Sequence, residues 1–144
     1  MTAPTDVPAF FRSLPELVGE GAVLYLEGTR IDEGAAAYLS QRQAPHAQTV
    51  PRSTLWPRPQ CFHMPATEAC LDGLASLSAA RGGDPTADHV TVYRDGRMLL
   101  TWYDAFCGDE VYLSKEIAES AVAAFCERVG STFRPFEGSS QAES

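Results

Sequence analysis

The alternation of hydrophobic and polar residues changes its period several times along the chain. Between residues 7 and 18, apolar side chains recur at the three- and four-residue spacing of a helix, and Asp6 is placed to cap the first turn. Pro15 lacks the amide hydrogen that a continuous helix would use, so we expect a short helix followed by a separate turn. The apolar run at 22–28, closed by Gly28, predicts a strand.

Two further segments of the first half predict helices with recognisable caps. Asp32 is a suitable N-cap for a helix that reaches to about Arg42. Thr67 precedes a second helix with an apolar stripe, and Gly82 and Gly83 are expected to end this helix. Gly73 lies inside that second helix and weakens it slightly.

The segment between these two helices has no helical period. Residues 43–60 contain four prolines, whose missing amide donors allow only partial regular pairing, so we expect a long surface loop with an extended, polyproline-like part. Loops of this length are uncommon in compact domains and often functional. Residues 60–64 (QCFHM) then predict a strand with Cys61 and His63 on one face.

The clearest local pattern is a hairpin centred on Asp95 and Gly96. An Asp-Gly pair between two strand-like runs is typical of a two-residue turn with positive φ at both positions. The turn predicts the cross-strand pairs Arg94–Arg97, Val92–Leu99 and Val90–Thr101. One face of the hairpin would then carry Val90, Val92, Leu99 and Tyr103, and the other Thr91, Tyr93, Met98, Leu100 and Trp102. Because both faces are largely apolar, we expect a central position in the sheet.

The last third of the chain predicts a meander, a helix and an edge strand. The tetrapeptide CGDE at 107–110 suits a turn, after which 111–114 returns antiparallel as the third strand. Ser114 would cap a helix over 115–129. Residues 132–136 predict a short edge strand.

This order of elements predicts an α+β fold, with helices packed on a mixed, mainly antiparallel sheet around the central hairpin and meander. A chain of 144 residues, 44% hydrophobic and 21% charged, fits one globular domain. We assign that domain to residues 7–136, with flexible ends at 1–6 and 137–144, where small polar residues dominate.

Net charge and apolar content bear on partners and compartment. The net charge is -8, and such a field repels phosphate backbones and anionic lipid, so nucleic-acid or membrane-surface binding is disfavoured and a basic partner is favoured. No apolar run is long enough for a membrane span, and the N-terminus lacks the pattern of a signal peptide, so we expect a cytoplasmic protein. The cysteines would be reduced thiols, mostly buried; they are Cys61, Cys70, Cys107 and Cys126.

Charge is also distributed unevenly along the chain. Residues 34–67 contain three arginines and no acid, whereas residues 104–119 contain five acids and one lysine. If these segments lie apart in space, the protein has two surfaces of opposite sign. The alternative is that the charges only solvate the surface.

The candidates for metal binding or nucleophilic catalysis are weak. Cys61 and His63 share a strand face and could contact one metal ion, but no CxxC or HxxxH pair is present, so we expect neither a metal nor a cofactor. The alternative is a buried thiol beside a hydrogen-bonded histidine. Cys107 could act as a nucleophile with His63 or His89 as base and Asp104 to orient it. Its acidic sequence neighbours, however, disfavour a thiolate.

Asp104 is the carboxylate least easily explained as a turn residue. By period-2 alternation it lies on the side of Trp102, where an unpaired carboxylate would be costly. It would pair with an arginine, cap backbone donors, lie at an exposed strand end or serve a function. Phosphate-binding loops and the motifs GxSxG and HExxH are absent, which lowers the expectation of an enzyme without excluding one.

Our leading hypothesis is a protein-binding module, such as an adaptor, inhibitor or immunity-type protein for a basic partner. Aromatic residues would supply binding energy and acids would speed encounter. The candidate binding residues are Trp56, Trp102, Asp104, Asp109, Glu110 and Tyr112. For each tryptophan the alternative is that it anchors its own segment onto the core. The alternative function is a small enzyme or ligand-binding protein, with a pocket near Asp104, His63 and Cys107 between the 43–60 loop and the sheet.

Overall fold

A computed structural model shows four helices and five strands among the residues that it describes. The described residues are 1–45, 47–48, 50, 58–80, 87–103 and 110–135. In chain order the elements are α1 Val7–Val18, β1 Val23–Gly28, α2 Glu33–Ser40, β2 Gln60–Pro65, α3 Glu68–Ala80, β3 His89–Arg94, β4 Arg97–Trp102, β5 Val111–Leu113 and α4 Glu119–Val129.

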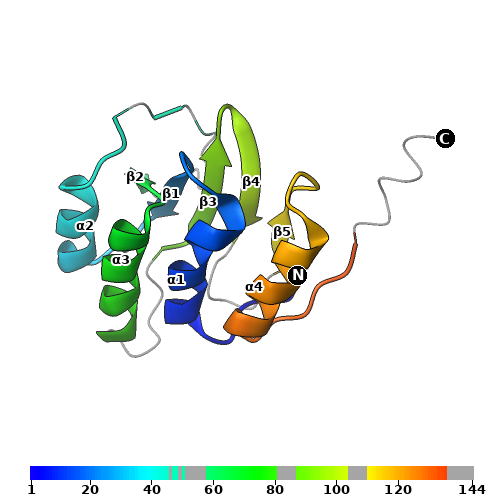
Figure 1. The fold of residues 1–144 in the computed structure, drawn as a ribbon. Coiled ribbons are helices and arrows are strands. Elements are labelled where there is room, and N and C mark those ends of the chain that lie inside the picture. Colours follow the sequence, from blue (N-terminus) through cyan, green and yellow to red (C-terminus); the bar gives the residue numbers. More distant parts are fainter. Residues whose placement is uncertain (46, 49, 51–57, 81–86, 104–109, 136–144) are drawn as a thin grey trace.

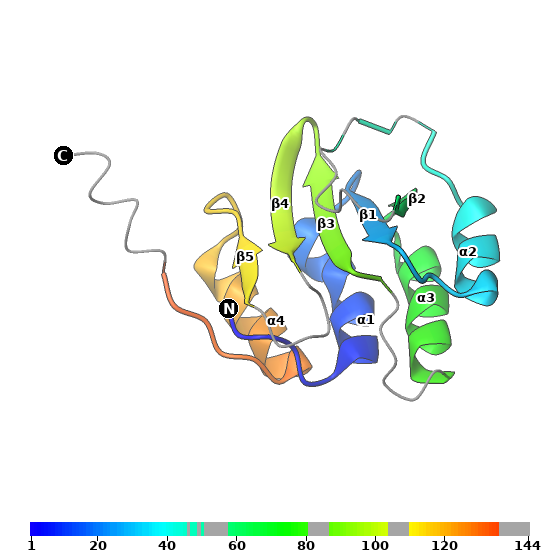
Figure 2. The ribbon, with the colours of Figure 1, turned by 180° about the vertical axis from the view of Figure 1, so that it is seen from behind.

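The strands form one sheet in the order β2-β1-β3-β4-β5, and every pairing is antiparallel. The expected α+β class is therefore confirmed, and β3, β4 and β5 form the expected meander. Helices α1, α3 and α4 pack on one face, with α2 beside α3 at the β2 end (Figure 1). Seen from behind, the strands lie in front of these helices, and none of the described helices covers this second face (Figure 2). We call it the helix-free face.

The hydrophobic core lies between the sheet and the three helices. Alternation along the strands directs one set of apolar side chains to it: Leu24, Leu26, Met64, Val90, Val92, Leu100, Trp102 and Val111. Phe10 of α1 sits at its centre and makes edge contacts with Trp102 and Phe125, at ring-centroid distances of 5.1 and 5.8 Å. Each large side chain buried in this way contributes about 1.5–3 kcal/mol to folding.

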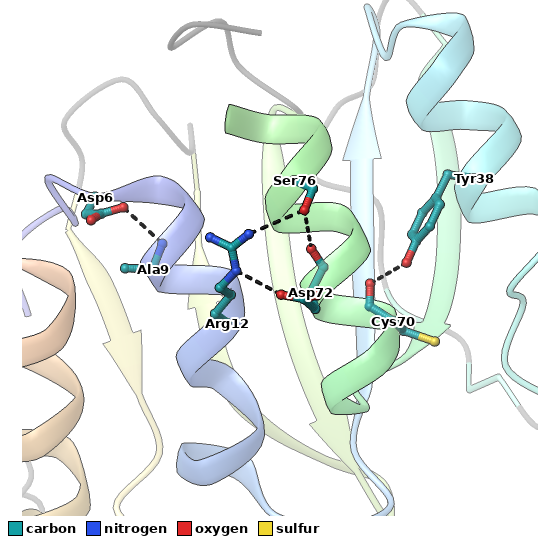
Figure 3. Close-up of polar contacts among 7 residues, drawn as sticks. All are labelled: Asp6, Ala9, Arg12, Tyr38, Cys70, Asp72 and Ser76. Atoms are coloured by element: carbon teal, nitrogen blue, oxygen red, sulfur yellow. Dashed lines mark hydrogen bonds and ion pairs between the residues drawn. The ribbon is translucent and has the colours of Figure 1, made fainter. Parts of the chain in front are cut away.

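Helix α1 is continuous through Pro15, so the expected division into a helix and a separate turn is wrong. Asp6 caps the helix as predicted, since its Oδ1 accepts a hydrogen bond from the Ala9 amide at 3.0 Å (Figure 3). Beyond the proline, the Gly19 amide still donates to the Pro15 carbonyl at 3.0 Å. An interior proline costs about 3 kcal/mol. The buried stripe of α1, which includes Phe10 and Phe11, outweighs that cost.

The hairpin turn and the Arg94–Arg97 pair are confirmed, but the predicted pairs Val92–Leu99 and Val90–Thr101 are wrong. Asp95 and Gly96 have φ values of 51° and 79°, as the Asp-Gly pattern requires. Arg94 pairs with Arg97, but Val92 pairs with Leu100 instead of Leu99 because of a register shift after Tyr93–Met98.

One extra residue in β4 reverses the predicted faces. A bulge of this kind moves every later side chain to the other side of the strand. Leu100 and Trp102 therefore join Val90 and Val92 in the core, where Leu99 is also buried. The predicted grouping of Leu100 and Trp102 with Thr91 is wrong.

Helices α2 and α3 begin at the predicted caps, and they pack closely together at a glycine of α3. Asp32 Oδ1 accepts from the Gly34 and Ala35 amides, and Thr67 Oγ1 accepts from the Cys70 amide at 3.3 Å. The Tyr38 hydroxyl donates to the Cys70 carbonyl at 2.7 Å (Figure 3).

Gly73 makes this close approach possible. A Cβ there would collide with the Tyr38 hydroxyl and lie 2.6 Å from its Cζ. On the outer surface, Arg12 of α1 bonds to Asp72 at 2.9 Å and to Ser76 at 3.3 Å on α3 (Figure 3).

The carboxy-terminal helix begins later than predicted. Ser114 remains tied to the sheet, because its amide donates to the Leu99 carbonyl at 2.8 Å, and a turn follows it. Helix α4 therefore starts at Glu119 and ends at Val129, and Gly130 caps it with a φ of 72°, the left-handed conformation expected there. Within 132–135 no strand forms, so the described part of the predicted edge strand is wrong.

The amino-terminal residues lie against β5 and the end of α4. The Val111 amide donates to the Met1 carbonyl at 2.9 Å, and the Thr2 amide donates to the Thr132 carbonyl at 2.8 Å. The flexibility expected of residues 1–6 remains a prediction about motion. The tail expected at 137–144 lies outside the described residues.

Candidate functional site: the helix-free face of the sheet

The helix-free face divides into a largely buried polar half and an exposed aromatic half. Cross-strand register places Tyr25 beside both His63 and Thr91, and Glu27 beside both Cys61 and His89. These residues, with Tyr93, form what we call the polar cluster of β2, β1 and β3. The face continues onto β4 and β5, where Thr101 pairs with Tyr112.

Glu27 is the most unusual member of the polar cluster, because its carboxylate is fully buried. The Tyr25 hydroxyl donates to its Oε1 at 2.7 Å, and His89 Nε2 lies 3.9 Å from its Oε2. Cys61 Sγ lies 3.3 Å from the same tyrosine oxygen. Burial, together with these two hydrogen bonds, raises the pKa of Tyr25 far above its usual value, so the hydroxyl keeps its proton at physiological pH.

A second hydrogen-bonded group surrounds the hydroxyl of Tyr93. His63 Nδ1 lies 2.9 Å from this oxygen, and the backbone amide of Gln48 donates to it at 3.1 Å. Burial lowers the pKa of His63 and raises that of Tyr93, because both charged forms would lose hydration. The ring of His63 lies 5.0 Å from that of Tyr25 and 5.8 Å from that of Tyr93. The two hydrogen-bonded groups therefore form one continuous polar cluster.

The other half of the face exposes apolar and aromatic side chains. Met98, Tyr103 and Tyr112 are the exposed large hydrophobic residues of the described chain, with 40%, 48% and 53% of their surface accessible. Tyr103 lies on this face because its ring contacts that of His89 at 5.9 Å, and Met98 because it pairs with Tyr93. These three residues and Thr101 form what we call the β4–β5 surface.

Charged residues of the described chain lie near both edges of the sheet. Glu110 is exposed directly before β5, and Glu116 follows that strand and forms an ion pair with Arg97. At the β2 end, the Arg42 guanidinium lies 3.8 Å from the centroid of the Tyr38 ring. The β2 and β5 strands are opposite edges of the sheet, so these acidic and basic segments are separated in space.

Of the residues predicted to bind a partner, two are exposed and one is buried. Glu110 and Tyr112 lie beside or on the β4–β5 surface. Trp102 has no accessible surface and packs on Phe10, so it anchors its strand and cannot contact a partner in this structure. Three further candidates, Trp56, Asp104 and Asp109, lie outside the described residues, as does Cys107 of the alternative site. His63 belongs to the polar cluster.

Cys61 and His63 share a strand face as predicted, but each is engaged with a tyrosine. Cys61 is exposed, contrary to the expectation of a buried thiol, whereas Cys126 is buried and Cys70 is half-buried. These three cysteines are free thiols. No group of three or more histidine, cysteine or acidic side chains suited to hold a metal ion occurs within the described parts of the chain.

Sequence reasoning missed the buried members of the polar cluster. Glu27 is a charged residue inside the apolar run AVLYLEG, two positions from Tyr25. A carboxylate at a strand position that is otherwise apolar is a signal of a buried polar contact. His89 and Tyr93 occupy the same alternating positions of β3, and only the sheet order brings them beside β1.

Comparisons with models of known protein families, with curated proteins and with solved structures found no match. Among the described residues, no helix combines the length and the apolar character needed to cross a membrane.

Proposed function

We propose that this protein is a protein-binding module whose β4–β5 surface receives a basic protein partner. The observation that carries the proposal is the exposure of Tyr103, Tyr112 and Met98 together on one face of the sheet. Tyrosine is enriched at interface hot spots, because it offers a large contact area and loses little conformational entropy on binding. Well-exposed aromatic groups on one strand pair are therefore suited to supply binding energy.

Electrostatics supports the choice of a basic partner. The chain carries a net charge of -8, and Glu110 adjoins the β4–β5 surface. Complementary charge of this kind accelerates encounter and selects the partner more than it raises affinity. The same charge disfavours direct binding of nucleic acid.

The proposed class is an adaptor, an inhibitor or an immunity-type protein that acts in the cytoplasm. The free thiols support this compartment, since an exposed reduced cysteine such as Cys61 is the form that a reducing environment maintains.

The test begins with capture of a stoichiometric partner at low salt, followed by measurement of binding kinetics. Tyr112→Ala should weaken the complex by roughly 30-fold, the effect of a hot spot of about 2 kcal/mol, mainly through faster dissociation. Glu110→Lys should slow association by roughly two- to tenfold, and added salt should reduce that difference.

A matched control separates local from overall charge. Glu127→Lys makes the same change in net charge at an exposed position of α4, on the helix side of the sheet. Equal rates for Glu110→Lys and Glu127→Lys would remove the local role of Glu110. Unchanged affinity of Tyr112→Ala would remove the proposed surface.

A second candidate function is small-ligand binding or acid–base chemistry at the polar cluster. It is favoured by one observation, the fully buried Glu27 carboxylate joined to Tyr25 and close to His89. Buried titratable groups with specific partners are enriched at functional sites. A small polar ligand that raises the melting temperature of the wild type and of Tyr112→Ala, but not of Glu27→Gln, would support this function over the first.

A further inference from the structure

The hydroxyl of Tyr93 is shared between a histidine of β2 and the chain that follows α2. His63 Nδ1 lies 2.9 Å away, and the Gln48 amide donates to the same oxygen at 3.1 Å. Tyr93 is only 3% exposed, so water has little access to complete its hydrogen bonds. The proton of this hydroxyl must therefore be used within the group.

One arrangement of protons satisfies both the Tyr93 hydroxyl and the Gln48 amide. Tyr93 has a single proton to donate, and its oxygen already accepts from Gln48. If His63 is neutral with its proton on Nε2, Nδ1 accepts the tyrosine proton. If His63 is protonated, Nδ1 also carries a proton, and the Tyr93 proton loses its acceptor. The arrangement thus favours neutral imidazole.

Two more hydrogen bonds attach the chain near Gln48 to the sheet. The Gln48 side-chain Oε1 accepts from the Gly96 amide at the hairpin turn at 3.1 Å, and the Ala44 amide donates to the His63 carbonyl at 2.9 Å. Neither bond involves a group that titrates near neutral pH. Among the attachments made by described residues, the Tyr93 hydroxyl is therefore the one that responds to acid.

We propose that His63, Tyr93 and the Gln48 amide form a pH-sensitive clasp that holds the chain at Gln48 on the helix-free face and loosens in acid. Tyr93 pairs with Met98 across β3 and β4, so loosening would extend the β4–β5 surface. That last consequence rests on the proposed function, whereas the clasp itself does not.

The groups around His63 agree with this direction. On the same face stand Tyr25 and Glu27 of β1, Cys61 of β2, and Tyr93 and His89 of β3. Helix α2 also contacts β2, and Arg42, which follows the C-cap of this helix, lies over the ring of Tyr38 within it. The Glu27 carboxylate would favour an imidazolium, but it accepts from Tyr25 and lies next to His89.

The sign of the pH dependence follows from the burial of His63. Burial lowers its pKa, so the closed clasp binds fewer protons than the open one. The clasp is therefore fully formed above the ordinary histidine pKa of about 6.5 and weakens as the pH falls through the lower pKa of the closed state.

Amide hydrogen exchange measured by NMR tests the clasp without any partner. The protection factor of the Gln48 amide is compared with that of the Ala66 amide, which bonds to the Ala22 carbonyl in the fold. Between about pH 7.5 and about pH 5, the protection factor of the Gln48 amide should fall by about 2- to 12-fold relative to that of Ala66. This range corresponds to the net contribution of one neutral hydrogen bond.

Four variants separate the clasp from general acid effects. His63→Asn places a non-titrating amide near the position of Nδ1 and should abolish the fall, while Tyr93→Phe should leave Gln48 weakly protected at both pH values. His89→Asn and His46→Asn should retain the fall. Three results would each overturn the proposal. The wild type could show no fall in the Gln48 protection factor, His63→Asn could retain the fall, or His89→Asn or His46→Asn could lose it.

Discussion

Consecutive residues of the chain meet opposite environments on the two faces of the sheet. On the helix-covered face, Leu24 and Trp102 are fully buried among apolar side chains from three helices. Their neighbours point the other way: Tyr25 enters a hydrogen-bonded polar cluster, and 48% of the Tyr103 surface is accessible. One face therefore supplies the stability of the fold, and the other holds its polar contacts and exposed aromatic groups.

The largest expected effect contrasts the neighbouring residues Trp102 and Tyr103. Trp102→Ala removes a fully buried ring that packs on Phe10 and should lower the free energy of unfolding by about 3–5 kcal/mol. Tyr103→Ala should change it by about 0.5 kcal/mol or less, because its ring is half exposed. Urea denaturation of both variants measures the contrast, and similar losses would mean that the two faces are not distinct.

A smaller loss is expected when the buried carboxylate is removed from the polar cluster. Glu27→Ala removes the charged acceptor of the Tyr25 hydroxyl, leaves only the weak acceptor Cys61 Sγ and should cost about 1.5–3 kcal/mol in the free energy of unfolding. Tyr25→Phe should cost less, and the double variant should cost less than the sum, because the two residues share one hydrogen bond. Additive losses in the double-mutant cycle would contradict the link between them.

On the helix-covered side, the packing of α3 against α2 predicts an unusual sensitivity to a single methyl group. Alanine normally favours a helix over glycine, but Gly73→Ala should destabilise the fold by about 1–3 kcal/mol because the new Cβ collides with Tyr38. In a Tyr38→Ala background the same substitution should be neutral or stabilising. Thermal unfolding of the four proteins checks this, and a stabilising Gly73→Ala in the wild type would refute the contact.

The smallest expected effect on stability is at the centre of the proposed binding surface. Tyr112→Ala and Met98→Ala should each change the free energy of unfolding by about 0.5 kcal/mol or less, because neither residue belongs to the core. A loss of more than about 1 kcal/mol from Tyr112→Ala in urea denaturation would show that the residue serves the fold instead of a partner.

Local patterns were sufficient to predict most elements of the fold but not the placement of faces. The caps Asp32 and Thr67 and the Asp95–Gly96 turn depend on short-range hydrogen bonds and backbone conformation, and all were predicted. The bulge in β4 has no such local signal, because it leaves Leu99 and Leu100 both buried in the core. Because this one-residue shift was not anticipated, the predicted faces of β4 were exchanged. Trp102 was therefore counted among the binding residues, although it lies in the core.

The candidate site was less predictable than the fold because it depends on the order of the strands. Sequence placed Cys61 and His63 on one face, but nothing in it indicated that Tyr25 would stand between that pair and Thr91. The continuity of α1 through Pro15 has a similar origin, since the burial that outweighs the proline comes from α3 and α4. Interactions between distant segments decided both outcomes.

The most direct test of the proposed binding surface is site-specific photo-crosslinking to the captured partner. A photoreactive phenylalanine derivative is placed at Tyr112, on the exposed β4–β5 surface, or at Glu127, on the exposed side of α4. The structure predicts that the partner is crosslinked from position 112 and not from position 127. Crosslinking from position 127 alone, or equally from both positions, would contradict the assignment of binding to the helix-free face.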